Sequence, residues 1–207
     1  MNEPASLRLY RHPLSGHCHR VELLLSLAAL PCELVSVDLA AGAHKHPSFL
    51  EQNGFGQIPV LVHGDAVLPD SNAILLYLAE TFPSAAEYLP RTPKQRAALQ
   101  RWLSVAAGQL AQGPAAARLV RVFGSKLDHA EAVANARALF AVFERELSQR
   151  DFFVGDAPTL ADFSLYAYTA HAPEGGVSLE PYPHVRAWLA RLEGLPRFVR
   201  MQRAGVS

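Results

Sequence analysis

The segment GQIPVLVHGDAVLPDS, residues 56–71, contains two short apolar runs joined by a turn. Residues 60–63 and 66–68 have the Val and Leu content of strands, and the tripeptide 63–65, HGD, indicates a tight hairpin between them. Pro59 precedes the first run and cannot donate to a sheet, so it must stand at an edge, a bulge or a strand start. The segment therefore predicts a β-hairpin that begins at a proline.

Pro59 allows two interpretations. In the first, it simply begins an edge strand. In the second, the Ile58–Pro59 peptide bond is cis, and the turn leaves the backbone of Ile58 free to pair with an extended peptide. The second interpretation would make this turn a peptide-binding site, and composition alone leaves both open.

Toward the N-terminus, the apolar pattern changes between strand and helix periods. Residues 6–10 alternate as a half-buried strand does, and residues 17–30 repeat apolar side chains at helical spacing until Pro31. Residues 33–39, ELVSVDL, predict a second strand, so the first two strands should be parallel with a right-handed crossover. Two more helices are predicted here, at 48–53 and 71–81. Together these elements predict an α/β domain of βαβαββα order.

The character of the sequence changes after Phe82. Residues 83–92 are rich in proline and predict a linker. Beyond them, every periodic segment is helical and rich in alanine. Helices are predicted at 94–112, 115–124, 129–150, 159–170, 183–192 and 196–203. The sequence thus predicts an α/β domain at 1–82 followed by an all-α domain at 93–207.

Composition argues against several function classes. Lys plus Arg and Asp plus Glu both number 19, so no net positive charge attracts nucleic acid. No apolar run approaches the roughly 18–20 residues that span a bilayer, and the first residues do not resemble a secretory signal. Cys18 and Cys32 are too few for a disulfide framework or a four-thiolate zinc site. We therefore expect a cytoplasmic protein that binds neither nucleic acid nor membranes.

Asp70 and Ser71 stand at the start of the predicted helix 71–81. Either side chain can be an N-cap, which accepts hydrogen bonds from the free N–H groups of the first turn. Alternatively, the pair binds a ligand that carries both an ammonium group and a carboxylate. Asp70 would then face the ammonium, while Ser71 and the helix N–H groups hold the carboxylate.

Ser15 lies between the first predicted strand and the first predicted helix. A serine at such a place is commonly a turn or cap residue. Alternatively, its hydroxyl donates to a thiolate near the helix N-terminus and so favours the thiolate, which is the nucleophilic form of a thiol. No general base would be needed for that chemistry.

Three segments resemble segments of the glutathione transferase superfamily and occur in the same order. Together with the helical part that follows them, the resemblance covers nearly the whole chain. Residues 7–27, LRLYRHPLSGHCHRVELLLSL, resemble the first strand, catalytic loop and first helix of a theta-like or related bacterial, serine-type member. Residues 42–61 resemble its second-helix region and cis-proline strand, and residues 68–83 resemble its γ-glutamyl-binding segment. The resemblance implies a thioredoxin-like domain followed by an all-helical one, and a glutathione transferase activity.

The resemblance also implies roles for residues of the first domain. Ser15 would stabilise the glutathione thiolate, and Ile58 would pair its backbone with the cysteinyl part of glutathione beside a cis Pro59. Gln57 would lie near the peptide. Glutathione would be a co-substrate, and no cofactor or metal is implied. The second substrate would be a small hydrophobic electrophile or an organic peroxide.

The same resemblance implies that other residues bind the two ends of glutathione. Asp70 and Ser71 would hold the γ-glutamyl end. His44 and Lys45 would contact the glycyl carboxylate, although a solvated turn is the alternative there. The family resemblance further implies a homodimer.

Two other functions remain open at this level. Cys18 could form mixed disulfides with glutathione, as in related oxidoreductases, although its place three residues after Ser15 favours a buried structural cysteine. The fold could also be a non-catalytic binding module. The histidines near the N-terminus do not suggest a metal site, because His17 and His19 point to different sides of a helix.

The helical half contains a folding motif and is expected to form one wall of a pocket. Thr159 and Asp162 have capping-box spacing at the start of a helix, which supports the family and not an active site. We expect the electrophile pocket between the domains, walled by Leu14 and by residues 101–110. The Gly/Pro-rich segment 171–183 has no assigned role.

Overall fold

A four-stranded mixed sheet forms the base of the molecule, and the computed structural model describes residues 6–205. Its order is β2-β1-β3-β4, with β1 parallel to β2 and antiparallel to β3, and β3 antiparallel to β4. The strands are β1 (Leu7–Arg11), β2 (Cys32–Ser36), β3 (Val60–His63) and β4 (Ala66–Pro69). The parallel pair and the hairpin predicted from the sequence are confirmed.

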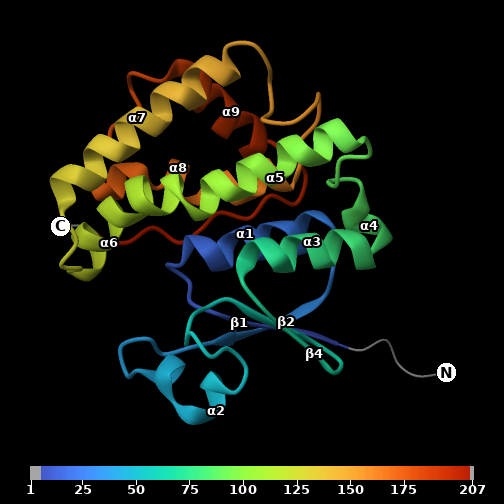
Figure 1. Ribbon diagram of the computed structural model, residues 1–207. Helices are drawn as coiled ribbons and strands as arrows, with labels where there is room; N and C mark the ends of the chain where they lie inside the picture. Colours follow the sequence, from blue (N-terminus) through green and yellow to red (C-terminus); the bar gives the residue numbers. More distant parts are fainter. Residues whose placement is uncertain (1–5, 206–207) are drawn as a thin grey trace.

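Helices cover both faces of this sheet. Helices α1 (Gly16–Leu27) and α3 (Ser71–Thr81) lie next to each other on one face, as Figure 1 shows. On the other face, a 3₁₀ turn at Ala43–Lys45 leads into the short helix α2 (Pro47–Leu50), whose Phe49 is buried in a small apolar cluster. The sheet is therefore the middle layer of a thioredoxin-like domain.

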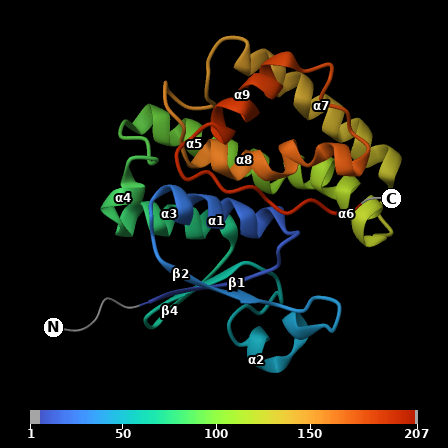
Figure 2. The same ribbon diagram turned by 180° about the vertical axis from the view of Figure 1, so that it is seen from behind.

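The helical domain packs against α1 and α3 on their side away from the sheet (Figure 2). Its elements are α5 (Pro93–Ala107), a π-helical turn at Ala111–Ala115, α6 (Ala116–Phe123), α7 (His129–Leu147), α8 (Leu160–Ala170), a 3₁₀ turn at Ala172–Gly175 and α9 (Pro183–Glu193). The helix predicted at 94–112 is therefore interrupted after Ala107, and a π-helical turn precedes α6. A single core cluster joins the two domains.

Helix α8 lies at the centre of the helical domain and is buried on all sides. Every residue from Leu160 to Thr169 is buried, including Asp162 and Ser164. A helix that is apolar nearly all round belongs in a core, because it has no face suited to water. Helices α1 and α5 both pack on α8, so it connects the domains.

The predicted capping box at the start of α8 is confirmed. The Asp162 carboxylate accepts from the backbone N–H of Thr159 at 2.8 Å and of Phe153 at 3.1 Å, and from Trp188 Nε1 at 2.9 Å. It also accepts from the Thr159 hydroxyl at 3.0 Å. One fully buried carboxylate thus joins the start of α8 to the preceding loop and to α9.

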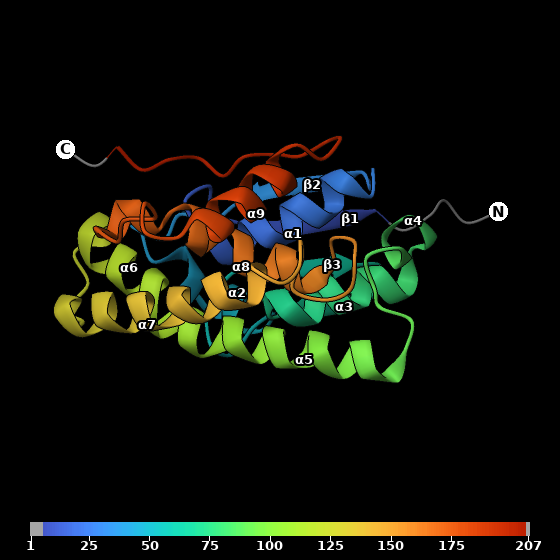
Figure 3. The same cartoon turned by 90° about the horizontal axis from the view of Figure 1, so that it is seen from above.

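Two segments differ from the prediction. Residues 83–92, predicted as a linker, contain the short helix α4 (Pro83–Ala86), which packs on α3. The helix predicted at 196–203 is wrong: this segment runs without helical structure along one side of the molecule (Figure 3). Arg197 has a φ of 65°, which a helix does not allow. Two side chains of α1 contact backbone carbonyls of the segment. Ser26 Oγ donates to the Arg197 carbonyl at 2.7 Å, and His19 Nε2 lies 2.9 Å from the Val199 carbonyl. Tertiary contacts therefore override a weak helical pattern.

Within residues 6–205, none of the helices combines the length and the apolar character that crossing a membrane requires.

Replacing Asp162 by Asn should lower the free energy of unfolding by about 3 kcal/mol, because in either orientation the new amide NH₂ faces a buried donor. Urea unfolding followed by circular dichroism would measure this change. Asp156→Asn is the matched control, because Asp156 is exposed, and surface changes cost within about 0.5 kcal/mol. Equal effects of the two substitutions would contradict the structural role of Asp162.

Candidate functional site

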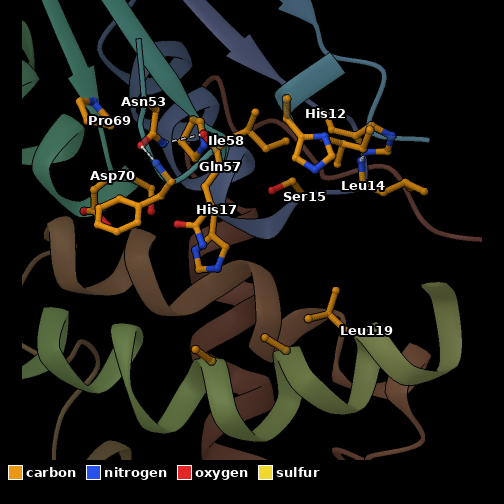
Figure 4. Close-up of a pocket in the computed structure, with 18 of the residues that line it drawn as sticks. His12, Leu14, Ser15, His17, Asn53, Gln57, Ile58, Pro69, Asp70 and Leu119 are labelled. Carbon is orange, nitrogen blue, oxygen red and sulfur yellow. Dashed lines mark hydrogen bonds between the residues drawn. The ribbon is translucent and has the colours of Figure 1, made fainter. Parts of the chain in front are cut away.

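A cleft of about 690 Å³ lies between the loops of the sheet domain and the π-helical turn with α6. All eight residues that the sequence analysis singled out for catalysis or glutathione binding line it. They are Ser15, His44, Lys45, Gln57, Ile58, Pro59, Asp70 and Ser71. Figure 4 shows Ser15, Ile58 and Asp70 along the sheet side of the cleft, with Leu119 facing them from α6.

Ser15 is the N-cap of α1, as one of the two interpretations predicted. Its Oγ accepts from the backbone N–H of Cys18 at 3.3 Å, and its own N–H donates to the His12 carbonyl at 3.0 Å. A hydroxyl that accepts through its oxygen keeps its proton for another partner. The cap geometry therefore leaves Ser15 able to donate to a ligand in the cleft.

Asp70 caps the N-terminus of α3 from an unusual backbone conformation. Its φ is 73°, in the left-handed region that a non-glycine residue rarely adopts. Its Oδ1 accepts from the N–H groups of Asn72 at 2.9 Å and Ala73 at 3.0 Å. Both bonds use the same oxygen, which leaves Oδ2 for a ligand. Backbone strain of this kind gathers at ligand sites.

Two buried side chains, from α1 and α8, and a backbone carbonyl of α5 hold the start of α3. Arg20 Nη1 donates to Ser71 Oγ at 3.2 Å and to Asn72 Oδ1 at 2.9 Å. Asn72 also accepts from Ser164 Oγ at 2.7 Å and donates to the Leu103 carbonyl at 3.2 Å. Burial lowers the pKa of Arg20 to about 10, so it remains a cation at neutral pH. A positive charge therefore lies directly behind Ser71.

The Ile58–Pro59 peptide bond is cis, which confirms the second interpretation of this proline. Pro59 is buried, whereas Ile58 is partly exposed and Gln57 is exposed. No backbone hydrogen bond involving Ile58 occurs in the described range. The buried Asn53 holds the turn, because its Nδ2 donates to the Gln57 carbonyl at 2.8 Å. The backbone of Ile58 is therefore available to an extended ligand.

His44 and Lys45 lie on the 3₁₀ turn before α2, at one end of the cleft. Lys45 Nζ donates to the carbonyls of Phe55 and Gly56 at 3.0 and 3.1 Å. An ammonium has three N–H donors, so one remains for a ligand. Gly56 permits this packing, because a Cβ there would lie 2.6 Å from the His44 carbonyl oxygen and its φ is +57°.

The opposite wall of the cleft is mostly apolar. It consists of Ala111, Ala115, Leu119 and Phe123 with the side chain of Arg118, whereas the predicted Leu14 lies beside Ser15 on the sheet side (Figure 4). The expectation that residues 101–110 form this wall is wrong, since Leu110, Trp102 and Leu103 are buried in the core. The wall begins one residue later, at Ala111, because the π-helical turn directs the following residues toward the cleft.

The residues of the site that sequence reasoning missed include Tyr168 and Arg118. Tyr168, on α8, lies against the first turn of α1: a Cβ on Gly16 would come within 2.8 Å of its ring, and its centroid is 5.0 Å from that of His17. The glycine directly after Ser15 was the available signal, since Gly permits such close approach. Arg118 had a weaker signal, as the single charged residue in the stretch 113–120.

Both halves of the chain match models of known protein families. The family model described as glutathione S-transferase, N-terminal domain, matches residues 9–90, and that of the glutathione S-transferase C-terminal domain matches residues 73–196. The chain belongs to the glutathione S-transferase family.

Relatives of this transferase support the assignment over nearly its full length. Glutathione S-transferase 3 of Zea mays is 37% identical over 206 residues, which cover 94% of this chain and 92% of the relative. The crystal structure of a glutathione S-transferase from Pseudomonas fluorescens has a TM-score of 0.89 at 32% identity and covers 95% and 99% of the two chains. That of glutathione transferase F7 from Populus trichocarpa has a TM-score of 0.81 at 32% identity, with 93% and 95% covered.

Cys18 of this transferase does not reach the cleft. It has no exposed surface, and burial raises the pKa of its thiol to about 11, although hydrogen bonds with Ser15 and the His12 backbone act in the opposite direction. A buried, protonated thiol cannot attack a disulfide. These observations disfavour the oxidoreductase interpretation that depended on Cys18.

Histidines surround the cleft without forming a metal site in the described part of the transferase. Three of them line it, namely His12, His17 and His44. Among residues 6–205, no three His, Cys, Asp or Glu side chains gather in a metal-binding group. Burial, and secondarily the nearby Arg20 charge, lower the pKa of His17 to about 3, so it is neutral at physiological pH.

Cys18 should resist alkylation in the native transferase, whereas Cys32 should react slowly, because Cys32 is partly exposed and Cys18 is not. Iodoacetamide treatment at about pH 8, followed by peptide mass mapping, would show this difference, since only the thiolate of an accessible cysteine reacts. Both residues should react after unfolding in guanidinium. Native labelling of Cys18 as fast as that of Cys32 would restore the Cys18 hypothesis.

Proposed function

We propose that this transferase binds glutathione as a thiolate and adds it to small hydrophobic electrophiles, with Ser15 as the hydroxyl donor to the sulfur. One observation carries the proposal. Ser15 accepts the Cys18 N–H through its oxygen, so its hydroxyl can donate to a ligand in the cleft that also contains Ile58, Asp70 and Ser71. On this proposal the chain is a serine-type member of the family.

The interactions available at Ser15 supply enough free energy to lower the pKa of the glutathione thiol. Lowering a thiol pKa from about 8.5 to about 6.5 requires roughly 2.7 kcal/mol. A hydrogen bond to a charged group contributes about 1.5–3 kcal/mol, and a helix N-terminus contributes about 0.3–1 kcal/mol to a nearby anion. Ser15 stands at the N-terminus of α1, so both contributions act on the same sulfur. No general base and no further cofactor are required.

The proposal places glutathione in the cleft in one direction. Its γ-glutamyl ammonium would meet Asp70 Oδ2, and the adjoining carboxylate would meet Ser71 and the first N–H groups of α3. Arg20 supports this end, because its cation donates to Ser71 Oγ. The cysteinyl backbone would pair with Ile58.

The other end of glutathione would lie by Gln57 and the 3₁₀ turn. The glycyl carboxylate would meet His44 and the third N–H of Lys45. The apolar wall formed by Leu119 and Phe123 then faces the sulfur and would receive the electrophile. An apolar wall excludes water from the thiolate and favours hydrophobic substrates.

Replacing Ser15 by Ala should raise the pKa of the bound glutathione thiol by about 1–2 units, because one charge-assisted hydrogen bond is lost. The ultraviolet absorbance of the thiolate, recorded across pH, measures this pKa directly. Conjugation should fall most at low pH and recover as pH rises, since the thiol then ionises without help. Ser15→Thr should retain part of the activity.

Asp70→Asn is the contrasting variant. It should weaken glutathione binding, measured by calorimetry, because the partner of the ammonium loses its charge, while the thiol pKa changes little. If Ser15→Ala binds glutathione with an unshifted thiol pKa, Ser15 does not stabilise the thiolate. If the wild-type chain binds no glutathione, the proposed function fails.

We further propose that the transferase is a cytoplasmic homodimer. Phe55, on the loop between α2 and β3, has 81% of its surface exposed, which is unusual for an aromatic side chain. Sedimentation should give a mass near twice the 22.6 kDa of the chain. Phe55→Ala should shift the equilibrium toward monomer and Leu127→Ala should not. A monomeric wild-type protein would refute the dimer.

A further inference from the structure

Arg118 is a buried arginine on α6 that the proposed chemistry does not yet use. Its side chain is 2% exposed, yet it lines the cleft. Its Nη1 donates to the backbone carbonyl of Leu14 at 2.8 Å, and its Nε donates to Glu174 Oε2 at 2.7 Å. Among residues 6–205, no other side chain of the helical domain donates a hydrogen bond to the loop formed by residues 12–15.

The Leu14 carbonyl belongs to the same peptide unit as the Ser15 N–H. That N–H donates to the His12 carbonyl at 3.0 Å. The peptide plane that precedes Ser15 is therefore held at both ends, once from within its own loop and once by Arg118. Because a peptide unit is planar, these two bonds together fix the orientation from which the Ser15 side chain departs.

The backbone of the helical domain is arranged to bring Arg118 to this point. The π-helical turn 111–115 precedes α6, and such insertions often occur at functional sites. A Cβ on Gly113 would lie 2.9 Å from Ala136 N, and one on Gly175 would lie 2.7 Å from Arg118 N. Both glycines therefore let α6 pack closer than a larger residue would allow.

Glu174 and His171 fix the arginine from behind. Glu174 Oε1 lies 2.7 Å from His171 Nδ1 and accepts from Ala204 N at 3.3 Å. Burial opposes ionisation of Glu174, but hydrogen bonds from His171 and Arg118 hold its pKa below the usual value, so the carboxylate is charged at neutral pH. The guanidinium and the carboxylate thus form a buried ion pair.

Fold stability alone does not account for this ion pair. Arg118 Nη2 is buried and has no partner in the described range, and an unsatisfied buried donor costs free energy. Apolar residues of similar volume commonly stabilise a fold as well as a buried ion pair does. A buried arginine with an unsatisfied nitrogen at the cleft therefore indicates a function beyond packing.

We propose that Arg118 is a positioning residue for Ser15: held by Glu174, it orients the Leu14–Ser15 peptide so that the Ser15 hydroxyl donates to the glutathione sulfur. The inference rests on the proposed role of Ser15. It also connects the two halves of the site, because Arg118 lies on α6 beside Leu119, a residue of the electrophile wall. The helical domain would thereby set the thiolate geometry from the electrophile side.

Arg118→Met, with Ser15→Ala and the double variant, tests the proposal. Arg118→Met should raise the pKa of bound glutathione by about one unit, a tenfold loss of thiolate well below that pKa. The dissociation constant of protonated glutathione should be unchanged, and turnover should approach that of the wild type at high pH. Adding Arg118→Met to Ser15→Ala should raise the pKa no further, because the effect passes through Ser15.

Two further variants control for poor folding and for a general effect of removing an arginine from α6. Arg118→Met/Glu174→Gln removes both charges, and so avoids leaving a buried carboxylate unpaired if the single variant folds poorly. Arg121→Met is the matched control, since Arg121 lies one turn further along α6 and is exposed. It should leave the thiol pKa and turnover unchanged.

Several results would overturn the proposal. A thiol pKa unaffected by Arg118→Met, a loss of turnover equal at all pH values, or additive effects with Ser15→Ala would each do so. If Ser15→Ala shifts the thiol pKa while Arg118→Met gives one of these three results, only the role of Arg118 is refuted. If Ser15→Ala shifts nothing, the proposed function of Ser15 fails first and the role of Arg118 fails with it.

Discussion

The site depends on one constraint: the first N–H groups of a helix have no partner inside that helix. Helices α1 and α3 both begin at the same cleft, so their free N–H groups need partners there. Ser15 and Asp70 supply them, and each keeps a polar atom for a ligand. The residues that stabilise the two helix ends are therefore also the ones proposed to bind glutathione.

The helical domain determines where these two helix ends lie. Helix α8 is buried throughout, and the Asp162 carboxylate holds its start. From α8, Ser164 bonds to Asn72 and so holds the beginning of α3, while Tyr168 covers Gly16 at the beginning of α1. Arg118 reaches the Ser15 loop from α6. The second domain thus supports the caps as well as lining one side of the cleft.

Local patterns carried much of the information. The Ile58–Pro59 turn, the Asp70 cap and the capping box at Thr159 were predicted because each depends on neighbours within three residues. The helical wall of the cleft was placed at residues 101–110, whereas it begins at Ala111, since no local signal marks a π-helical turn. The segment 196–203 was predicted to be helical because its own sequence does not reveal the contacts made by Ser26 and His19.

The sequence by itself determined the order of strands and helices in the first domain and indicated Ser15 and Asp70 as candidate caps, because short-range sterics and hydrogen bonding decide these features. It left the cis form of the Ile58–Pro59 bond as one of two interpretations, which the structure decides. Only the tertiary structure decided that Cys18 is inaccessible, that Arg20 and Asn72 stand behind Ser71, and that Arg118 holds the peptide before Ser15. These facts join residues 50 to more than 100 positions apart in the chain. Packing of α1 against α3 and of α6 against the loop before Ser15 creates those contacts, and no periodicity within any of these segments encodes them.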